Sequence, residues 1–373
     1  MKITVNTKNL YDALKLGVIN SNVSKFFPNS LYAQLSLENG KLRINIEAEN
    51  VLTELVIPGI CDSDEPASEF IESVPFKNIV STITSDTVDI DFVNGGIVVK
   101  SGKSKYTLNN SSGGVGIVYN RPISDFHDLE SYPISVDDWK FIRDNQLFAI
   151  SDSKTSHPVY RYVWVSENDD VLAGDFERDF FIRSQYPTLG STCLLSDTII
   201  NLFASLPDGC NLYHVGNEYV IRYLSDAFSY YTQFTLASES NPSIGSYNSE
   251  FILDMLYPSD NYSTISCEEV YKCLKQASLL FDGNSSRWII KFEKGEGSVH
   301  ISDDHVDVEI ECTGTNVDNY TTYFFYENFE RLMRNYKSGT FNISPIIQED
   351  SVVGVIVWND DTISVLSTLN VIS

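Results

Sequence analysis

The chain has 373 residues, and its 26 Lys and Arg stand against 51 Asp and Glu, which gives a formal net charge of −25. This excess of acid argues against an ordinary basic nucleic-acid-binding domain. A hydrophobic share of 42% provides enough apolar side chains for buried cores. Because single cores stop growing at roughly 250–300 residues, we expect two or three domains.

The distribution of apolar residues argues against a membrane protein. No window approaches the run of about 18 apolar residues that a spanning helix requires. The opening residues, MKITVNTKNL, alternate polar and apolar side chains, whereas a signal peptide has a continuous apolar run. We therefore expect a soluble protein located in a cytoplasm, with no membrane partner.

Two kinds of periodicity predict the secondary structure. Apolar residues spaced three and four apart predict helices over residues 6–20, 136–150 and 267–281, and a further helix after each of these, over residues 74–83, 195–206 and 325–336. Short runs in which polar and apolar residues alternate, bounded by turn residues, predict strands. The clearest strands cover residues 41–47, 88–93, 97–100, 105–108, 219–223, 288–292, 306–311 and 352–358.

The helices recur at a fixed interval. The cap residues of the first helix of each set, Asn6, Ser135 and Ser266, lie 129 and 131 residues apart. This interval predicts a threefold internal repeat of about 125 residues, each repeat holding two helices and about eight strands. Stretches rich in Ser, Asn and Gly at residues 109–120 and 238–248 mark the loops between repeats. We therefore predict an α+β fold of three domains, over residues 1–122, 123–246 and 247–373.

No motif indicates catalysis or a metal site. The string SGKSK at residues 101–105 has the ending of a phosphate-binding loop, but Ile97 stands where the loop needs glycine, and strands flank it on both sides. We interpret it as a hairpin turn. The six cysteines lack paired spacing, and His300 and His305 lack the spacing of a zinc-binding helix. The protein is therefore expected not to be an enzyme and to need no metal or cofactor.

The scarce basic residues gather on the predicted helices and in the loops that follow them. They are Lys8, Lys15, Lys140, Arg143, Lys272, Lys275, Arg331, Arg334 and Lys337 on helices, and Lys25, Lys154 and Arg287 in loops. The three loop residues lie 129 and 133 residues apart, which is again the repeat period. Either these are solvated faces that form ion pairs with nearby acids, or the faces all point to one place.

Three segments carry a resemblance to a known family. They are the start MKITVNTKNLYDAL, the stretch GGIVVKSGKSKYTL that closes the first repeat, and the late FYENFERLMRNYKSGTFNI. Together with the threefold repeat they resemble the bacterial-type DNA polymerase sliding clamp, the β subunit of the replicase, over essentially the whole chain. The residue identity is diffuse, which indicates a divergent member and leaves open a cellular or a viral source.

The resemblance implies a homodimer of three-domain chains that forms a six-domain ring, with helices lining the central hole and sheets forming the outer wall. Its implied partners are duplex DNA, held topologically and not by sequence, a DNA polymerase, and an ATP-driven clamp loader. The basic residues given above would then contact DNA.

The family also has an apolar groove between its second and third domains that takes a short polymerase peptide. Its lining would fall on Ala173, Gly174, Phe176, Leu369, Val371 and Ile372. Glu177 stands where the family has a basic residue, which leaves the peptide specificity in doubt.

Two other functions stay open. One is a monomeric adaptor with a clamp fold, acting in transcription or interfering with a host clamp, which would keep the repeat but lose ring closure. The other is an acidic β-rich virion structural protein, which would share the composition without repeat-phased basic loops.

Overall fold

The fold comes from a computed structural model of the chain. It describes residues 1–18, 32–48, 51–63, 65–110, 129–150, 157–175, 180–185, 189, 191–215, 218–237, 243–258, 260–279, 289–294, 298–302, 307–313, 319–335, 339–349, 351–360 and 362–367. The chain divides into a first compact unit, Met1–Trp139 with Asn201–Leu236, and a second, Lys140–Ile200 with Ala237–Ser373.

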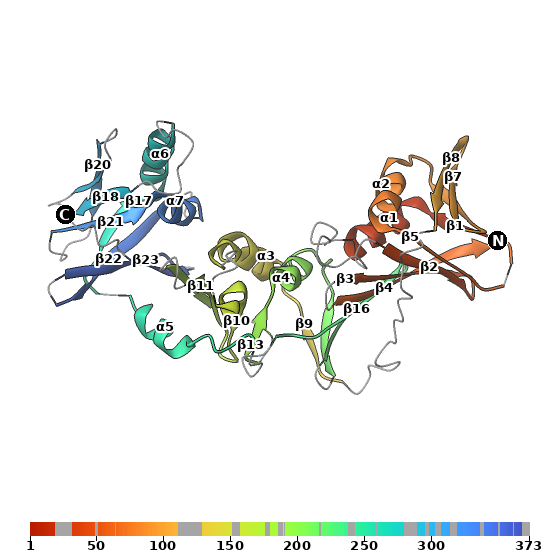
Figure 1. The fold of residues 1–373 in the computed structure, drawn as a ribbon, viewed down its shortest axis with the longest axis horizontal. Helices are drawn as coiled ribbons and strands as arrows, with labels where there is room; N and C mark the ends of the chain where they lie inside the picture. The colour runs from red at the N-terminus through yellow and green to blue at the C-terminus, as the bar shows by residue number, and fades with distance from the viewer. Residues whose placement is uncertain are drawn as a thin grey trace. The chain divides into compact units, whose positions relative to one another are not determined.

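The first unit is built on one antiparallel sheet. Its strands are β1 (Lys2–Asn6), β2 (Tyr32–Glu38), β3 (Lys41–Ala48), β4 (Val51–Cys61), β5 (Ala67–Glu72), β6 (Thr87–Val93), β7 (Gly96–Ser101), β8 (Ser104–Asn109), β9 (Ser131–Pro133), β14 (Asn211–Val215), β15 (Glu218–Leu224) and β16 (Ser229–Phe234). Helices α1 (Thr7–Gly17) and α2 (Ser73–Thr82) pack side by side in this unit (Figure 1).

The second unit has a sheet of its own. Its strands are β10 (Val163–Val165), β11 (Asp170–Asp175), β12 (Phe180–Gln185), β13 (Cys193–Leu195), β17 (Ser263–Ser266), β18 (Ile289–Lys294), β19 (Ser298–Ser302), β20 (Asp307–Thr313), β21 (Tyr320–Phe325), β22 (Thr340–Gln348), β23 (Ser351–Trp358) and β24 (Thr362–Ser367).

Seven α-helices lie among the described residues. Helices α6 (Cys267–Ser278) and α7 (Tyr326–Asn335) pack side by side in the second unit, which also contains α5 (Ser249–Met255) and the 3-10 turns η3 (Leu147–Ala149) and η4 (Pro158–Arg161). The boundary between the units falls within α3 (Val136–Asn145) and within α4 (Asp197–Phe203).

The order of elements repeats three times along the chain. A strand and a helix are followed by four strands, a second helix and three strands, once from β1 to β8, again from β9 to β16 and again from β17 to β24. The first and third repeats also share their strand neighbours. The order is β8-β7-β6-β1-β4-β3-β2-β5 in one and β24-β23-β22-β17-β20-β19-β18-β21 in the other. The boundaries at residues 122 and 246 stay a prediction.

Repeats are joined by adding a strand to a sheet edge. Strand β16, the last of the second repeat, pairs with residues 51–56 of β4, the fourth strand of the first repeat. Strand β24, the last of the third repeat, pairs in the same way with β12, the fourth strand of the second. Inside the first of these junctions, the buried hydroxyls of Thr53 and Thr232 lie 3.0 Å apart and share a hydrogen bond.

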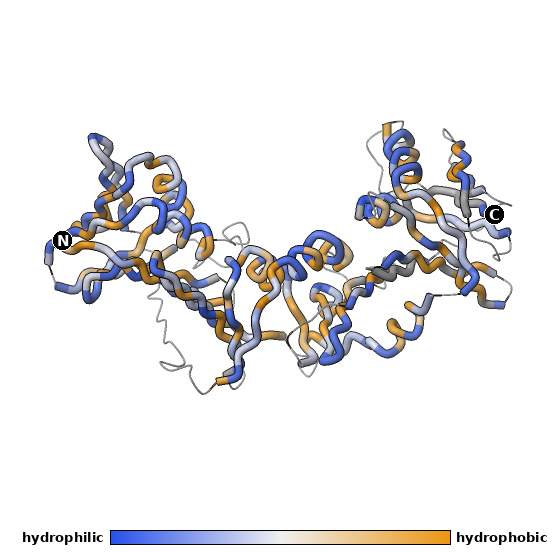
Figure 2. The backbone as a smooth tube through the Cα atoms, turned by 180° about the vertical axis from the view of Figure 1, so that it is seen from behind, coloured by the Kyte–Doolittle hydropathy of each residue, from blue (hydrophilic) through white to orange (hydrophobic). Residues whose placement is uncertain are grey.

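The elements are amphipathic, as their sequences predict. In α1, Leu10, Ala13 and Leu14 are fully buried, and in α7, Phe329 and Leu332 are. Apolar segments are short and interrupted by hydrophilic ones along the backbone (Figure 2). Among the described residues, no helix is long and apolar enough to cross a membrane.

The expected α+β class and antiparallel sheets are confirmed, and each of the clearest predicted strands is found to within two residues. The hairpin turn over the SGKSK string is also confirmed, since it joins β7 to β8. The prediction of one helix over residues 136–150 is wrong at its end, because α3 stops at Asn145 and a 3-10 turn follows. The Gln146 side chain, fully buried, bonds to Ser184 Oγ at 2.6 Å and so draws the chain away from the helix axis.

The packing of α1 gives a first prediction. Leu10→Ala should lower the free energy of unfolding by about 2–5 kcal/mol, since it removes a fully buried side chain and leaves a cavity. Lys8→Ala changes an exposed position of the same helix and should stay within about 0.5 kcal/mol of the parent. Urea denaturation of both full-length variants measures the difference. Equal stability of the two variants would contradict the assigned burial of this helix.

Candidate nucleic-acid interface and edge strands

Helix α1 presents two lysines on the side opposite its buried residues. The helix begins where the Asn6 side chain accepts a hydrogen bond from the Asn9 N–H at 3.0 Å, as the sequence predicts for a cap residue. Lys8 and Lys15 are both exposed. Within the described part of the chain, neither makes an ion pair.

Helices α6 and α7 carry the basic residues of the third repeat. Lys272 and Lys275 on α6 are exposed, and the Lys275 ammonium lies 4.9 Å from the centre of the Tyr271 ring. On α7, Arg331 pairs with Glu327, and Arg334 pairs with Glu330 at 2.7 Å. The two arginines are thus already compensated by acids one turn earlier. The lysines of α6 therefore offer more of their charge to an external anion than the arginines of α7 do.

Helix α3 carries Lys140, which is exposed, and Arg143. The Arg143 guanidinium bonds to Asp144 at 2.7 Å, and this hydrogen bond raises the pKa of Arg143. The other four basic residues named in the sequence lie outside the described residues; they are Lys25, Lys154, Arg287 and Lys337. Whether all of these side chains face one place therefore stays a prediction.

The sequence analysis missed one lysine that belongs with this set. Lys77, on α2, donates from its Nζ to the Val18 carbonyl at 3.3 Å, at the C-terminal end of α1. Burial lowers its pKa, and the charge of Lys15 lowers it further. The charges of Lys77 and Lys15 therefore lie close enough to interact across the helix pair. Lys77 stands in the second predicted helix of the first repeat, but its nearness to α1 is a tertiary contact that the spacing of residues does not report.

The expected peptide groove is only partly described. Ala173 and Gly174 are buried in β11, and a Cβ on Gly174 would lie 2.3 Å from the Phe181 ring, so glycine is required for this close approach. Phe176, Leu369, Val371 and Ile372 lie outside the described residues.

An apolar cluster surrounds β11 in the second unit. Trp164, Phe181, Tyr247 and Trp358 are all buried in it, and α5 packs Ile252 and Leu256 against the same cluster. The buried cluster combines these four aromatic side chains with seven aliphatic ones, and whether it borders a peptide groove stays a prediction.

Two of the open sheet edges carry opposite charges. Among the described residues, β8 pairs with β7 alone, and its exposed Lys105 is followed by the half-buried Tyr106. In β20, residues 307–311 pair only with β19 among the described residues, and Asp307 and Glu309 are 74% and 63% exposed. Edge strands of this kind present free backbone groups to another strand.

A cleft of about 530 Å³ lies between β20 and α6. Cys273, Gln276, Val308 and Ile310 contribute to its lining, and so does Lys272. Burial raises the pKa of Cys267, at the start of the same helix, to about 11, so this thiol is not primed for chemistry. Among the described residues, no group of His, Cys, Asp or Glu side chains is arranged to hold a metal ion.

No family model matches the sequence, and no curated protein matches it. Solved structures do match. A putative DNA polymerase III β subunit from Eubacterium rectale matches with a TM-score of 0.78 and 14% identity, covering 100% of both chains. The β subunit of Thermotoga maritima matches with a TM-score of 0.78 and 12% identity over 99% of both chains. A sliding clamp from Pseudomonas aeruginosa matches with a TM-score of 0.74 and 16% identity over 100% of both chains. The chain therefore has, over its full length, the fold of the bacterial DNA polymerase III β subunits, the sliding clamps.

Proposed function

We propose that this protein is a DNA sliding clamp, a homodimeric ring that encircles duplex DNA and tethers a DNA polymerase. The observation that carries the proposal is the placement of exposed lysines on α1 and α6, the corresponding helices of two repeats, in a clamp-fold chain whose net charge is −25. The proposed role needs no catalysis, metal or cofactor.

The weak basic character of these helices suits a sliding protein. A closed ring holds DNA by topology, so strong phosphate contacts are unnecessary and would slow movement along the duplex. Exposed lysines give short-range, salt-screened attraction that centres the duplex without reading its sequence. The acidic remainder of the molecule repels DNA and disfavours binding elsewhere on its surface.

Ring closure follows from the way that repeats join within the chain. If each of the three repeats is a domain, two chains supply six domains. Of the fourth strands of the repeats, only β20 is not yet used in a junction, and of the last strands, only β8 is not. We therefore propose that β8 of one copy adds to β20 of the other, as β16 adds to β4 and β24 adds to β12. A clamp loader would open this junction.

The junction within the first unit supplies the register of the proposed pairing. In β4, Gly59 lies opposite Val5 of β1, and in β20, Cys312 lies opposite Ile265 of β17. Val5 and Ile265 each lie two residues before the next helix, so the two registers are equivalent.

Glu54 lies five residues before Gly59 in β4, and Asp307 lies five residues before Cys312 in β20, so these two acids occupy corresponding positions. Glu54 lies opposite Tyr231 of β16. Lys105 of β8 corresponds to Tyr231, since each lies opposite the fifth residue of the strand before it. The intrachain template therefore sets Lys105 of one copy against Asp307 of the other.

The same register supports an apolar contact on the helix side of the sheet. Side chains alternate along a strand, so Tyr106 and Leu108 of β8 lie on the face opposite Lys105. Both are half-buried in the single chain. Val308, half-buried, and Ile310, buried, line the cleft beside α6, and polar side chains such as Glu269 and Gln276 line it too. The other copy would thus offer Tyr106 and Leu108 a partly apolar surface.

Charge reversal tests this pairing. Lys105→Glu should weaken the dimer roughly tenfold, because like charges then face each other at both junctions of the ring, and tenfold corresponds to about 1.4 kcal/mol. The combined variant Lys105→Glu with Asp307→Lys should recover most of the affinity. Sedimentation over a concentration series measures both. Failure of the combined variant to recover would contradict the proposed register, and a parent chain that stays monomeric at micromolar concentration would favour the monomeric adaptor.

Charge reversal on the helices tests DNA binding. Copies dissociated by dilution would be reassociated around nicked circular DNA, and the time that the ring remains on the circle would be measured. Lys15→Glu should shorten this time roughly two- to fivefold, as expected for an exposed charge worth about 0.5–1 kcal/mol. Lys41→Glu removes the same charge from an exposed strand end and should have no effect.

Cutting the circle should release the parent protein, because an encircled duplex then has free ends. Retention on the linear product, or equal effects of the two reversals, would contradict a topological clamp.

The polymerase contact is proposed at the family's groove, with Phe176 and the last residues of the chain as its apolar anchors. Removal of one anchor typically costs 2 kcal/mol or more, roughly thirtyfold in affinity. Phe176→Ala, or deletion of the last five residues, should weaken binding of a polymerase peptide and leave the dimer intact. Normal peptide binding by both variants would place the docking site elsewhere. The proposal is completed by a cytoplasmic location, in the host's cytoplasm if the chain is viral.

A further inference from the structure

His300 stands at the open edge where the second copy is proposed to dock. It is the third residue of β19, and its two ring nitrogens lie 3.7 Å from Asp307 and 3.6 Å from Glu309 on β20. On its other side, Glu293 of β18 is its backbone neighbour in register. Each ring nitrogen is thus close to an acidic oxygen, and the charge of an imidazole depends on whether it carries a proton.

The corresponding position in the first repeat holds a permanent cation. Arg43 is the third residue of β3, and its guanidinium pairs with Glu54, the counterpart of Asp307. The Glu54 side chain is only 6% exposed, because β16 covers this edge within the chain.

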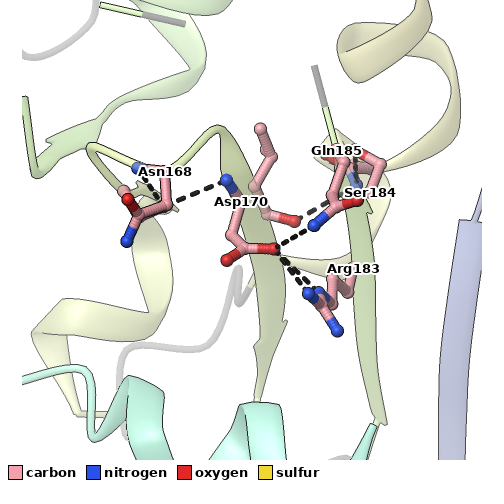
Figure 3. A network of polar contacts seen from close by, with 8 residues as sticks. Asn168, Asp170, Arg183, Ser184 and Gln185 are labelled. Carbon is pink, nitrogen blue, oxygen red and sulfur yellow. Dashed lines mark hydrogen bonds and ion pairs between the residues drawn. The ribbon is translucent and has the colours of Figure 1, made fainter. Parts of the chain in front are cut away.

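The second junction is also accompanied by an arginine. Arg183 of β12 and Asp170 of β11 form an ion pair at 2.8 Å, and both are largely buried. In Figure 3, Arg183 and Gln185 converge on the Asp170 carboxylate. Both junctions inside the chain therefore contain an arginine–acid pair, with the arginine on the third strand of the repeat in one and on the fourth strand in the other, whereas the edge left for another copy has a histidine.

We propose that closure of the ring is coupled to the protonation of His300, so that acidification weakens the pairing of β8 with β20. The inference rests on the proposed function, since it concerns the junction between two copies. It assigns to His300 a regulatory role in that junction.

The direction of the pH effect on dimer affinity follows from the charges that the second copy brings. The pairing sets Lys105 beside Asp307 and, two residues along, Lys103 beside Glu309, the two acids that contact the imidazole. Other charged groups on the neighbouring strands of the same chain, among them Glu293 and Lys291 of β18 and Glu311 of β20, are present whether or not the partner is bound. Docking therefore adds positive charge near His300 and removes water from it, and both changes disfavour the imidazolium. By linkage, a proton on His300 must disfavour docking.

The dissociation constant of the full-length dimer, measured by sedimentation between pH 8 and pH 5.5, tests the proposal. For the parent chain it should rise roughly three- to tenfold as the pH falls, with one such histidine at each of two junctions. His300→Gln should remove most of this rise and keep the dimer tight at pH 5.5. His300→Arg should give a weaker dimer at all pH values, again without the rise.

His305→Gln is the matched control. His305 stands two residues before Asp307 in the sequence, outside the described residues, and the control should keep the parent's pH profile. Lys105→Gln should reduce the pH dependence, because it removes a charge that opposes the proton.

Two results overturn the proposal: a parent dimer whose affinity does not change with pH, or a His300→Gln variant that keeps the parent's profile. Either would leave the ring itself standing. Absence of a dimer at every pH would instead overturn the proposed function.

Discussion

The addition of one strand to the edge of another repeat's sheet is the constraint on which the rest of this structure depends. Each repeat ends in a strand with one free edge, and its fourth strand has a free edge as well. Two such pairs are satisfied inside the chain, by β4 with β16 and by β12 with β24. The outer edge of β8 and residues 307–311 on the outer edge of β20 meet no strand among the described residues of one chain. An unpaired edge favours association, and an edge of the same design as two internal junctions favours association with the same chain.

This constraint also leaves the helices free for another role. Because strands make the junctions, α1 and α6 need only bury one side against their own sheets and neighbouring helices. Their outward sides can then carry lysines, which an acidic chain can afford in few places. The pairing of Arg331 and Arg334 with glutamates of α7 shows that not every basic residue contributes equally to this surface. Charge counted from the sequence overstates the field that a helix presents.

The sequence predicted much of the fold because strand alternation and helix caps are local signals. Asn6 caps α1 as expected, and Ser266 accepts from the Glu269 N–H at 3.4 Å at the start of α6. The end of α3 could not be predicted in this way, because it depends on the buried hydrogen bond from the Gln146 side chain to Ser184, a residue of the distant strand β12. The burial of Gly174 likewise depends on a tertiary contact, with Phe181 of the next strand. The ion pairs of Arg143 with Asp144 and of Arg334 with Glu330 are instead local to their own helices.

For the candidate nucleic-acid interface, the sequence predicted only that basic residues lie on certain helices. The helical pattern placed Lys8, Lys15, Lys272 and Lys275 on helices, where they are exposed. The proposed register of Lys105 with Asp307 needed the strand pairings. A periodic sequence does not state which edges meet. Lys77 was missed because spacing between basic residues on one helix does not report a neighbour on another.

The difference between arginine and histidine at equivalent positions has a physical basis in burial. A carboxylate that stays covered, as Glu54 does, must keep a cation at all pH values, because an unpaired buried charge is costly. Asp307, 74% exposed in the single chain, is hydrated while the edge is open and needs no permanent partner. In the proposed dimer, Lys105 of the second copy brings a cation to Asp307, so the chain needs no permanent cation of its own there. An arginine at His300 would therefore be redundant in the open state and repulsive in the closed one, whereas a neutral imidazole is neither.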